Sequence, residues 1–141
     1  MALAVRAPIH RLQKSKLGLQ SFGAIAQAIA ARAAGFGMSI VAHPYLQDAD
    51  IRAHGATPVL LDELIEQADY LVIQARLRAQ TKDLIGEVEL QRMKPGAVLI
   101  NTARGPIVTD AALYRALSVG SPAPGWTRSP RSRPNNEIGN R

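Results

Sequence analysis

Residues 92–105, R-M-K-P-G-A-V-L-I-N-T-A-R-G, constrain the fold more than any other part of the chain. A proline and a glycine interrupt the segment, residues 97–100 form an apolar run of strand length, and residues 101–105 have the composition of a turn. The pattern predicts a buried strand followed by a loop that presents Arg104. Open α/β sheets bind ligands on such loops, at the carboxyl ends of their strands. Arg104 is therefore the leading candidate for a side chain that contacts a ligand.

Strand-like and helix-like segments alternate over the first 117 residues. Repeated strand–helix units of this length predict an α/β fold with a doubly wound parallel sheet and helices on both faces. The first helix is expected to bury the face that carries Ile25, Ile29, Ala33 and Phe36. The predicted strands are residues 17–20, 39–42, 59–61, 70–73 and 97–100, and the predicted helices are residues 24–36, 62–68, 87–93 and 110–117.

Composition limits the class of protein. The chain has 141 residues, of which 47% are hydrophobic, so it can form the core of one domain. It has no cysteine and no apolar run long enough to span a membrane, which excludes thiolate metal sites and favours a cytoplasmic location. We expect no metal site and no membrane association.

The net charge of +6 comes from the two ends of the chain. Four basic residues and no acidic residue precede residue 17, and residues 118–141 carry four arginines and one glutamate. The remaining residues hold 9 basic and 10 acidic side chains, so the predicted domain is nearly neutral. Because only 4% of the chain is aromatic, nucleic-acid binding is not expected.

The segment at residues 92–105 closely resembles the M-K-x-G-A-x-L-I-N-x-x-R-G signature of the D-isomer-specific 2-hydroxyacid dehydrogenases. The resemblance implies a Rossmann-like NAD(P)-binding domain, NAD as cofactor with NADP not excluded, and a small 2-hydroxy or 2-oxo acid as substrate. It also implies that Arg104 binds the substrate carboxylate, a task that suits a planar guanidinium. Thr102 and Ala103 occupy the adjoining cofactor-binding positions, and a homodimer is compatible with the family.

A second resemblance lies between the first predicted strand and helix, where L-G-L-Q-S-F-G-A-I-A is similar to the family's L-G-x-x-G-x-G-x-I-G/A. Ser21, Gly23 and Ala26 fall on the three glycine positions. Backbone amides around Gly23, Ala24 and Ile25 are then expected to hold the cofactor pyrophosphate at a helix N-terminus. If the turn requires a positive φ at Ser21, its β-carbon costs about 1 kcal/mol. An ordinary strand-to-helix turn explains this segment about as well.

Other family positions are altered. V-A-H-P-Y stands where the family carries A-x-D-P-Y, so the aspartate that accepts from the ribose is missing and His43 is the candidate replacement through a ring nitrogen, although a solvated histidine is the alternative. After the fourth strand, Leu77 and Thr81 match the family's H-x-P-L-T-x-x-T, whereas Gln74 and Arg76 do not. The family's acid–base histidine follows the arginine motif, and no histidine follows Arg104 here.

Two functions remain open. The first is the NAD(P)-binding domain of an oxidoreductase that transfers hydride between a nicotinamide and a 2-hydroxy or 2-oxo acid, without turnover expected from this chain alone. The second is a non-catalytic fragment that binds a dinucleotide or a sister subunit. The resemblance begins near Pro8 and ends near Leu117, so the implied domain is incomplete on its C-terminal side.

The sequence divides into a basic lead-in at residues 1–16, the dinucleotide-binding domain at residues 17–117, and a tail at residues 118–141. The tail is rich in Pro, Ser, Gly, Asn and Arg, and is expected to be disordered. Residues 120–134, back-translated with GC-rich codons and read in another frame, give L-A-G-A-G-L-D-A-L-A-E-E-P-P, which resembles the segment that the family places here. We therefore expect the tail to be the product of a frameshift.

Overall fold

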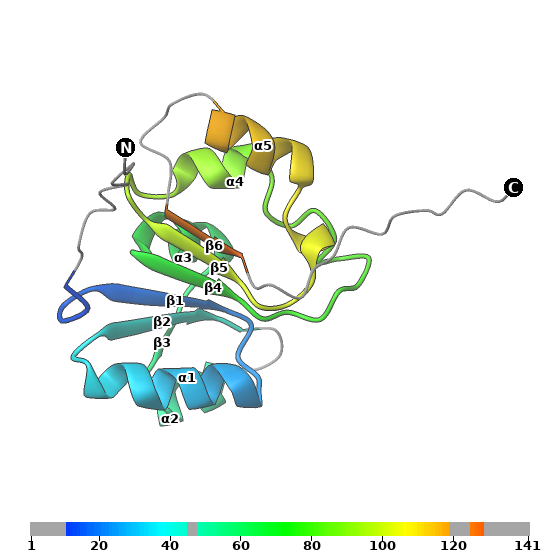
Figure 1. Ribbon diagram of the computed structural model, residues 1–141. Coiled ribbons are helices and arrows are strands. Elements are labelled where there is room, and N and C mark those ends of the chain that lie inside the picture. Colours follow the sequence, from blue (N-terminus) through cyan, green and yellow to red (C-terminus); the bar gives the residue numbers. More distant parts are fainter. Residues whose placement is uncertain (1–10, 45–47, 119–124, 129–141) are drawn as a thin grey trace, which may run out of the picture.

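A computed structural model describes residues 11–44, 48–118 and 125–128, and in these residues six strands form one parallel sheet in the order β3-β2-β1-β4-β5-β6 (Figure 1). The predicted doubly wound α/β sheet is thereby confirmed. The strands are β1 (Lys16–Gln20), β2 (Ser39–His43), β3 (Thr57–Pro58), β4 (Tyr70–Ile73), β5 (Val98–Asn101) and β6 (Gly125–Arg128). The helices are α1 (Ala24–Gly35), α2 (Asp48–Ala53), α3 (Leu61–Gln67), α4 (Glu87–Arg92) and α5 (Asp110–Ser118), with a 3-10 turn at Gly105–Ile107.

The helices cover the two faces of the sheet in separate groups (Figure 1). Helices α1 and α2 pack on one face through alanines and Ile51, against Leu17 and Leu19 of β1. Helices α3, α4 and α5 pack on the other face, where Leu71 of β4 and Leu99 of β5 are buried. The change of face falls between β1 and β4, because the chain crosses from β3 at one edge to β4 on the far side of β1.

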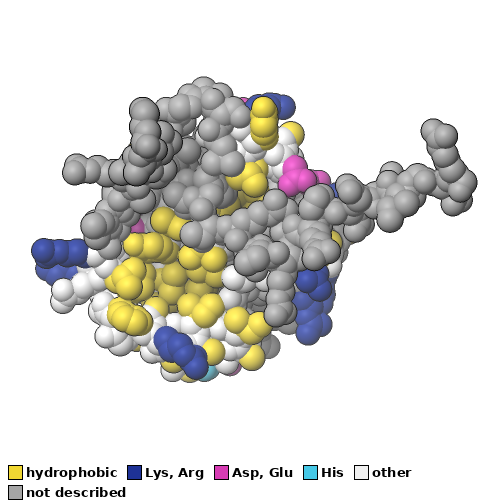
Figure 2. All heavy atoms as spheres, in the orientation of Figure 1, with side chains coloured by type: hydrophobic (Ala, Val, Ile, Leu, Met, Phe, Trp, Pro, Cys, Tyr) yellow, Lys and Arg dark blue, Asp and Glu magenta, His cyan; other side chains and the backbone are white. Residues whose placement is uncertain are grey.

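The buried face of α1 differs from the prediction. The helix buries Ala26, Ala30 and Ala33, whereas Ile25 is 70% exposed and Phe36 is 61% exposed. Hydrophobicity alone favoured the larger side chains, but a face of alanines lets the helix backbone approach the sheet closely. Figure 2 shows hydrophobic side chains gathered on the side of the molecule where α1 lies.

Two further elements correct the prediction near the third strand. The strand comprises only Thr57–Pro58, and residue 61 already belongs to α3. Proline is tolerated here because β3 is an edge strand. Helix α2 was not predicted, since a helix of six residues with Ile51 as its buried apolar anchor is too short to show a periodic pattern.

The tail also departs from the prediction, because Gly125–Arg128 form β6 and pair in parallel with β5. An open strand edge pairs through backbone amides and carbonyls, so the pairing does not require a strand-like sequence. The expected absence of regular structure is therefore wrong for these four residues and for Ser118, the last residue of α5, and for residues 119–124 and 129–141 it lies outside the described part of the chain. The frameshift origin of the tail stays a prediction, which the nucleotide sequence of the gene would test.

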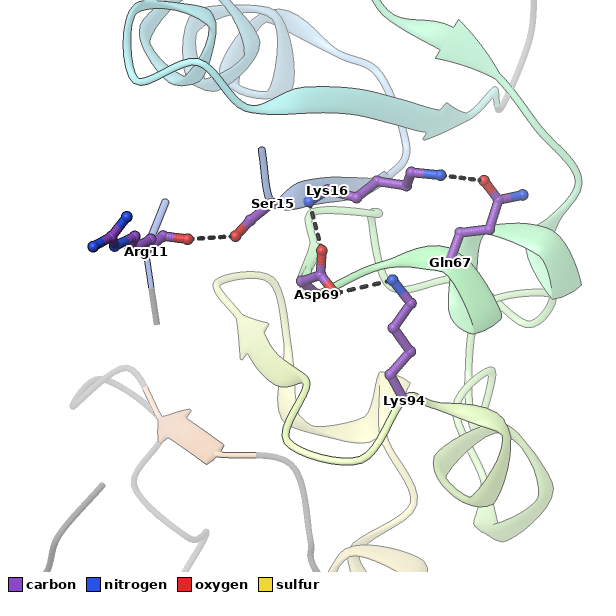
Figure 3. Close-up of polar contacts among 6 residues, drawn as sticks. All are labelled: Arg11, Ser15, Lys16, Gln67, Asp69 and Lys94. Atoms are coloured by element: carbon purple, nitrogen blue, oxygen red, sulfur yellow. Dashed lines mark hydrogen bonds and ion pairs between the residues drawn. The ribbon is translucent and has the colours of Figure 1, made fainter. Parts of the chain in front are cut away.

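Asp69 joins three strands at the amino edge of the sheet (Figure 3). Its carboxylate accepts from the Lys16 amide at 2.7 Å and from Lys94 Nζ at 2.9 Å, and its backbone carbonyl accepts from the Val98 amide at 2.8 Å. Partial burial raises the pKa of Asp69, but the bonds from Lys16 and Lys94 outweigh that effect and hold the pKa below its ordinary value. The residue therefore fixes the start of β1, β4 and β5 relative to one another.

Candidate nucleotide-binding site

The candidate site lies at the carboxyl edge of the sheet, where backbone hydrogen bonds continue past the strand ends. The Ser21 amide donates to the His43 carbonyl at 3.2 Å, the Gln74 amide to the Gln20 carbonyl at 3.2 Å, and the Thr102 amide to the Ile73 carbonyl at 3.2 Å. These bonds link the loops that follow β1, β2, β4 and β5. Ligands of doubly wound sheets bind at this edge, where the strand order reverses beside β1.

Ser21 begins the turn from β1 to α1 with a φ of 82°. The turn therefore does require a positive φ at this position. Serine adopts it although its β-carbon, which glycine lacks, makes this conformation unfavourable. The side chain of Ser21 is half-buried beside the end of β2, to which its amide is bonded. The substitution stores strain at the point where the backbone must turn toward the helix.

Gly23 is the N-cap of α1 and has an ordinary φ of −82°. A β-carbon built at Gly23 meets no atom within 4 Å, so neither the backbone conformation nor the packing of the described residues requires glycine here. The helix has no side-chain cap and no acidic residue in its first turn, and Ala24 and Ile25 are exposed. Free amides and open space at a helix N-terminus fit the approach of an anionic group to the backbone.

His43 ends β2 and is half-buried. Its Nδ1 lies 3.1 Å from the carbonyl oxygen of Val59, in the segment between β3 and α3. This contact fixes the ring against the neighbouring loop. The histidine is therefore held at the strand end and is not a freely rotating surface side chain.

The loops after β4 and β5 are bonded to each other. Thr102 Oγ1 donates to the Ile73 carbonyl at 3.2 Å, and further along the same loops the Asp83 amide donates to the Pro106 carbonyl at 2.8 Å. Within the first loop, buried Thr81 accepts from the Arg78 amide at 2.8 Å and donates to the Arg76 carbonyl at 2.7 Å. These bonds fix the conformation of this loop, although Arg76 stands where the family's motif has a proline.

Arg104 lies where the sequence predicts, exposed on the loop after β5 and immediately before the 3-10 turn. Its carbonyl accepts from Asn101 Nδ2 at 3.1 Å, and Asn101 Oδ1 accepts from the Ala103 amide at 3.0 Å. Asn101 thus closes the loop on itself and holds the arginine outward. Among the described residues the guanidinium has no ion-pair partner, which leaves it available to an anion.

Two glutamines at this edge have a side-chain oxygen without a hydrogen-bond partner in the described part of the chain, and the sequence drew attention only to Gln74, as a departure from the family motif. Gln20 is buried, with 4% of the residue exposed. Its Oε1 has no hydrogen-bond partner among the described residues. Gln74 Nε2 reaches Thr102 Oγ1 at 3.5 Å, while its Oε1 is likewise buried without a partner in the described structure. Only tertiary packing reveals an unpaired acceptor, so no sequence pattern signals it.

The described residues contain no group of His, Cys, Asp or Glu side chains that could hold a metal ion, and none of their helices is long and apolar enough to cross a membrane. In this structure a tight turn joins β1 to α1, and the strand order of the parallel sheet reverses beside β1. This architecture is that of the dinucleotide-binding domains.

Comparison with known proteins gives the family. Residues 4–123 match the model of the D-isomer specific 2-hydroxyacid dehydrogenase NAD binding domain, and the chain belongs to this family as its NAD-binding domain. It is 40% identical to a glyoxylate reductase of Thermococcus litoralis over 112 residues, which are 79% of this chain and 34% of that protein. It is 36% identical to a glycerate dehydrogenase of Methylorubrum extorquens over 81% of this chain and 34% of that protein. The chain thus spans about a third of the curated relatives.

Solved structures of dehydrogenases and reductases resemble this chain over most of its length. A glyoxylate reductase from Paecilomyes thermophila has a TM-score of 0.75 and 37% identity over 84% of this chain and 37% of that one. An NAD-dependent formate dehydrogenase from Staphylococcus aureus in complex with NAD has a TM-score of 0.80 and 32% identity over 89% of this chain and 38% of that one.

Proposed function

We propose that this chain binds NAD along the carboxyl edge of its sheet and serves a D-2-hydroxyacid dehydrogenase as its nucleotide-binding part. The observation that carries the proposal is Gly23, a glycine that the fold itself does not require. In a dinucleotide-binding turn the second glycine lets the backbone approach the pyrophosphate. The open space beside Gly23 and the free amides of α1 support that role.

Ser21, Gly23, Ala24 and Ile25 would hold the pyrophosphate, His43 the ribose, and the loop with Thr102 and Ala103 the nicotinamide half. Bound NAD supplies a hydride acceptor at its nicotinamide. The chain's own residues orient it, because the bonded loops fix the positions of their backbone amides relative to the sheet edge. NADP is not excluded.

Arg104 would bind the carboxylate of a small 2-hydroxy or 2-oxo acid. A guanidinium engages both carboxylate oxygens at once and stays charged at all relevant pH values. Its exposure on a loop closed by Asn101 supports the role. A homodimer and a cytoplasmic location belong to the same proposal.

The second candidate function is a non-catalytic module that binds a dinucleotide or a sister subunit. The altered positions Ser21, His43 and Gln74 favour it, because each departs from the residue that the family uses. Dinucleotide binding is part of the first function and one form of the second. The first test therefore measures nucleotide binding and not turnover.

Gly23→Ala tests the binding site, with Gly35→Ala as the matched control at the other end of α1. Neither β-carbon meets an atom within 4 Å, so both variants should unfold at temperatures within a few degrees of the parent. In titrations of NADH fluorescence we expect weak binding by the parent and about tenfold weaker binding by Gly23→Ala, which corresponds to about 1.4 kcal/mol. Equal affinities in the two variants would contradict the proposed site.

A further inference from the structure

We infer that Arg76 and Arg104 together bind a 2-hydroxy or 2-oxo acid that carries a second anionic group, a carboxylate or a phosphate, at its far end. The inference deepens the proposed function and rests on it, because Arg104 is there the residue that binds the carboxylate next to the reacting carbon. Arg76, on the neighbouring loop, binds the second anionic group. The substrate class is then a dianionic acid and not a simple monocarboxylate.

The two arginines occupy equivalent places on neighbouring loops. Strands β4 and β5 pair in parallel up to Ile73 and Asn101. One residue further along each loop, Gln74 Nε2 reaches Thr102 Oγ1 at 3.5 Å. Each arginine follows two residues after this contact, and both arginines are exposed. Because parallel strands end at the same edge of a sheet, both cations lie at the carboxyl edge, where ligands of such sheets bind.

The backbone of each arginine is held by a side chain of its own loop. Thr81 Oγ1 donates to the Arg76 carbonyl at 2.7 Å, and Asn101 Nδ2 donates to the Arg104 carbonyl at 3.1 Å. Buried Ala75 and Thr81 anchor the first of these loops to the core. Since the backbone of both loops is already ordered, less conformational entropy is lost when a ligand binds to the arginines.

The loop that carries Arg76 is bonded to the loop that carries Arg104 at its far end as well. The Asp83 amide donates to the Pro106 carbonyl at 2.8 Å, and the Ile85 amide donates to the Ile107 carbonyl at 3.0 Å. Residues 74–85 therefore form one bonded pair of loops with residues 102–107. An acid whose carboxylate is bound by the second loop lies beside the first loop.

Positive charge is concentrated on this pair of loops. Residues 74–85 and 102–109 hold four of the nine basic side chains of residues 17–117, but Asp83 is their one acidic residue among ten. Asp83 Oδ1 accepts from Thr109 Oγ1 at 3.4 Å, and within the described residues neither Arg76 nor Arg104 has an ion-pair partner. Like charges on adjoining loops repel, so a ligand with two anionic groups is favoured over a ligand with one.

The experiment compares two acids of equal length, 2-oxoglutarate and 2-oxopentanoate, of which the first ends in a carboxylate and the second in a methyl group. Their dissociation constants are measured by NMR titration of the full chain at neutral pH and low ionic strength. The parent should bind 2-oxoglutarate about fivefold more tightly, as expected for one exposed ion pair. A second pair, phosphoglycerate and glycerate, shows whether a phosphate is favoured over a carboxylate.

Arg76→Gln should lower the ratio of the two dissociation constants to about one, chiefly by weakening the binding of 2-oxoglutarate. Lys82→Gln is the matched control, because Lys82 is an exposed cation on the same loop, and this variant should keep the ratio. Arg76→Lys should restore part of the ratio, since the charge remains while the planar guanidinium is lost. Because the side chains are exposed, these variants should unfold at temperatures close to that of the parent.

Three results overturn the inference alone: equal ratios in the parent and Arg76→Gln, an equal loss of the ratio in Lys82→Gln, or weaker NADH binding by Arg76→Gln, which would assign Arg76 to the cofactor. Failure of the parent to bind NADH contradicts the proposed function and the inference with it. The same holds if the parent binds neither acid, or if Arg104→Gln leaves the binding of 2-oxopentanoate unchanged.

Discussion

At the scale of single residues, Ser21 is the clearest site of stored strain, because a non-glycine residue there has a φ of 82°. Ser21→Gly should raise the free energy of unfolding by about 1 kcal/mol, measured by urea denaturation. It should also tighten NADH binding, since the turn regains the residue that best fits its backbone. Ser39→Gly, in a strand without positive φ, should destabilise the fold instead. If both substitutions change the free energy of unfolding in the same direction, the strain at Ser21 is contradicted.

At the scale of elements, Gly18 allows β1 and α3 to approach closely. A β-carbon at Gly18 would lie 2.8 Å from the β-carbon of Ala68 and 3.2 Å from Leu64. Gly18→Ala should therefore lower the free energy of unfolding by about 1–3 kcal/mol through overpacking, measured by thermal or urea denaturation. Gly35→Ala, where a β-carbon meets nothing within 4 Å, is the control and should not destabilise. An unchanged free energy of unfolding in Gly18→Ala would show that α3 can move away from β1 without loss of stability.

Asp69 links three strands, and its lowered pKa makes part of their stability depend on pH. A carboxylate whose pKa is lower in the folded state stabilises the fold above its unfolded pKa of about 3.9, and this contribution is lost as the pH falls through the folded pKa. Unfolding measured between about pH 6 and pH 2 should show that loss in the parent. Asp69→Asn should reduce stability by about 1 kcal/mol at neutral pH and flatten the acid slope, a modest effect because the side chain is 37% exposed. An equal slope in the variant would contradict the role of Asp69.

At the scale of the whole molecule, the chain spans about a third of its curated relatives and holds no histidine after Arg104. We expect the purified chain not to reduce glyoxylate, hydroxypyruvate or pyruvate above background in assays of NADH oxidation. Loss of acid–base groups typically lowers rates by about 10² to 10⁴, before substrate positioning is counted. Turnover that Arg104→Ala abolishes would contradict this expectation.

Local sequence patterns predict the alternation of strands and helices, the parallel sheet and the position of Arg104 on the loop after β5. These features depend on local periodicity and on Pro and Gly positions, which act over a few neighbouring residues. The need for a positive φ at Ser21 was also foreseeable, because it depends on one residue in a recognisable turn.

Three features emerge only from tertiary packing: the face that α1 buries, the pairing of Gly125–Arg128 with β5, and the contact of His43 Nδ1 with the Val59 carbonyl. Each of these depends on a partner distant in sequence: the sheet under Ala26 and Ala30, the open edge of β5, and the Val59 carbonyl. Hydrophobicity and propensity describe a residue and its neighbours, whereas packing distance and hydrogen-bond pairing are properties of two segments together.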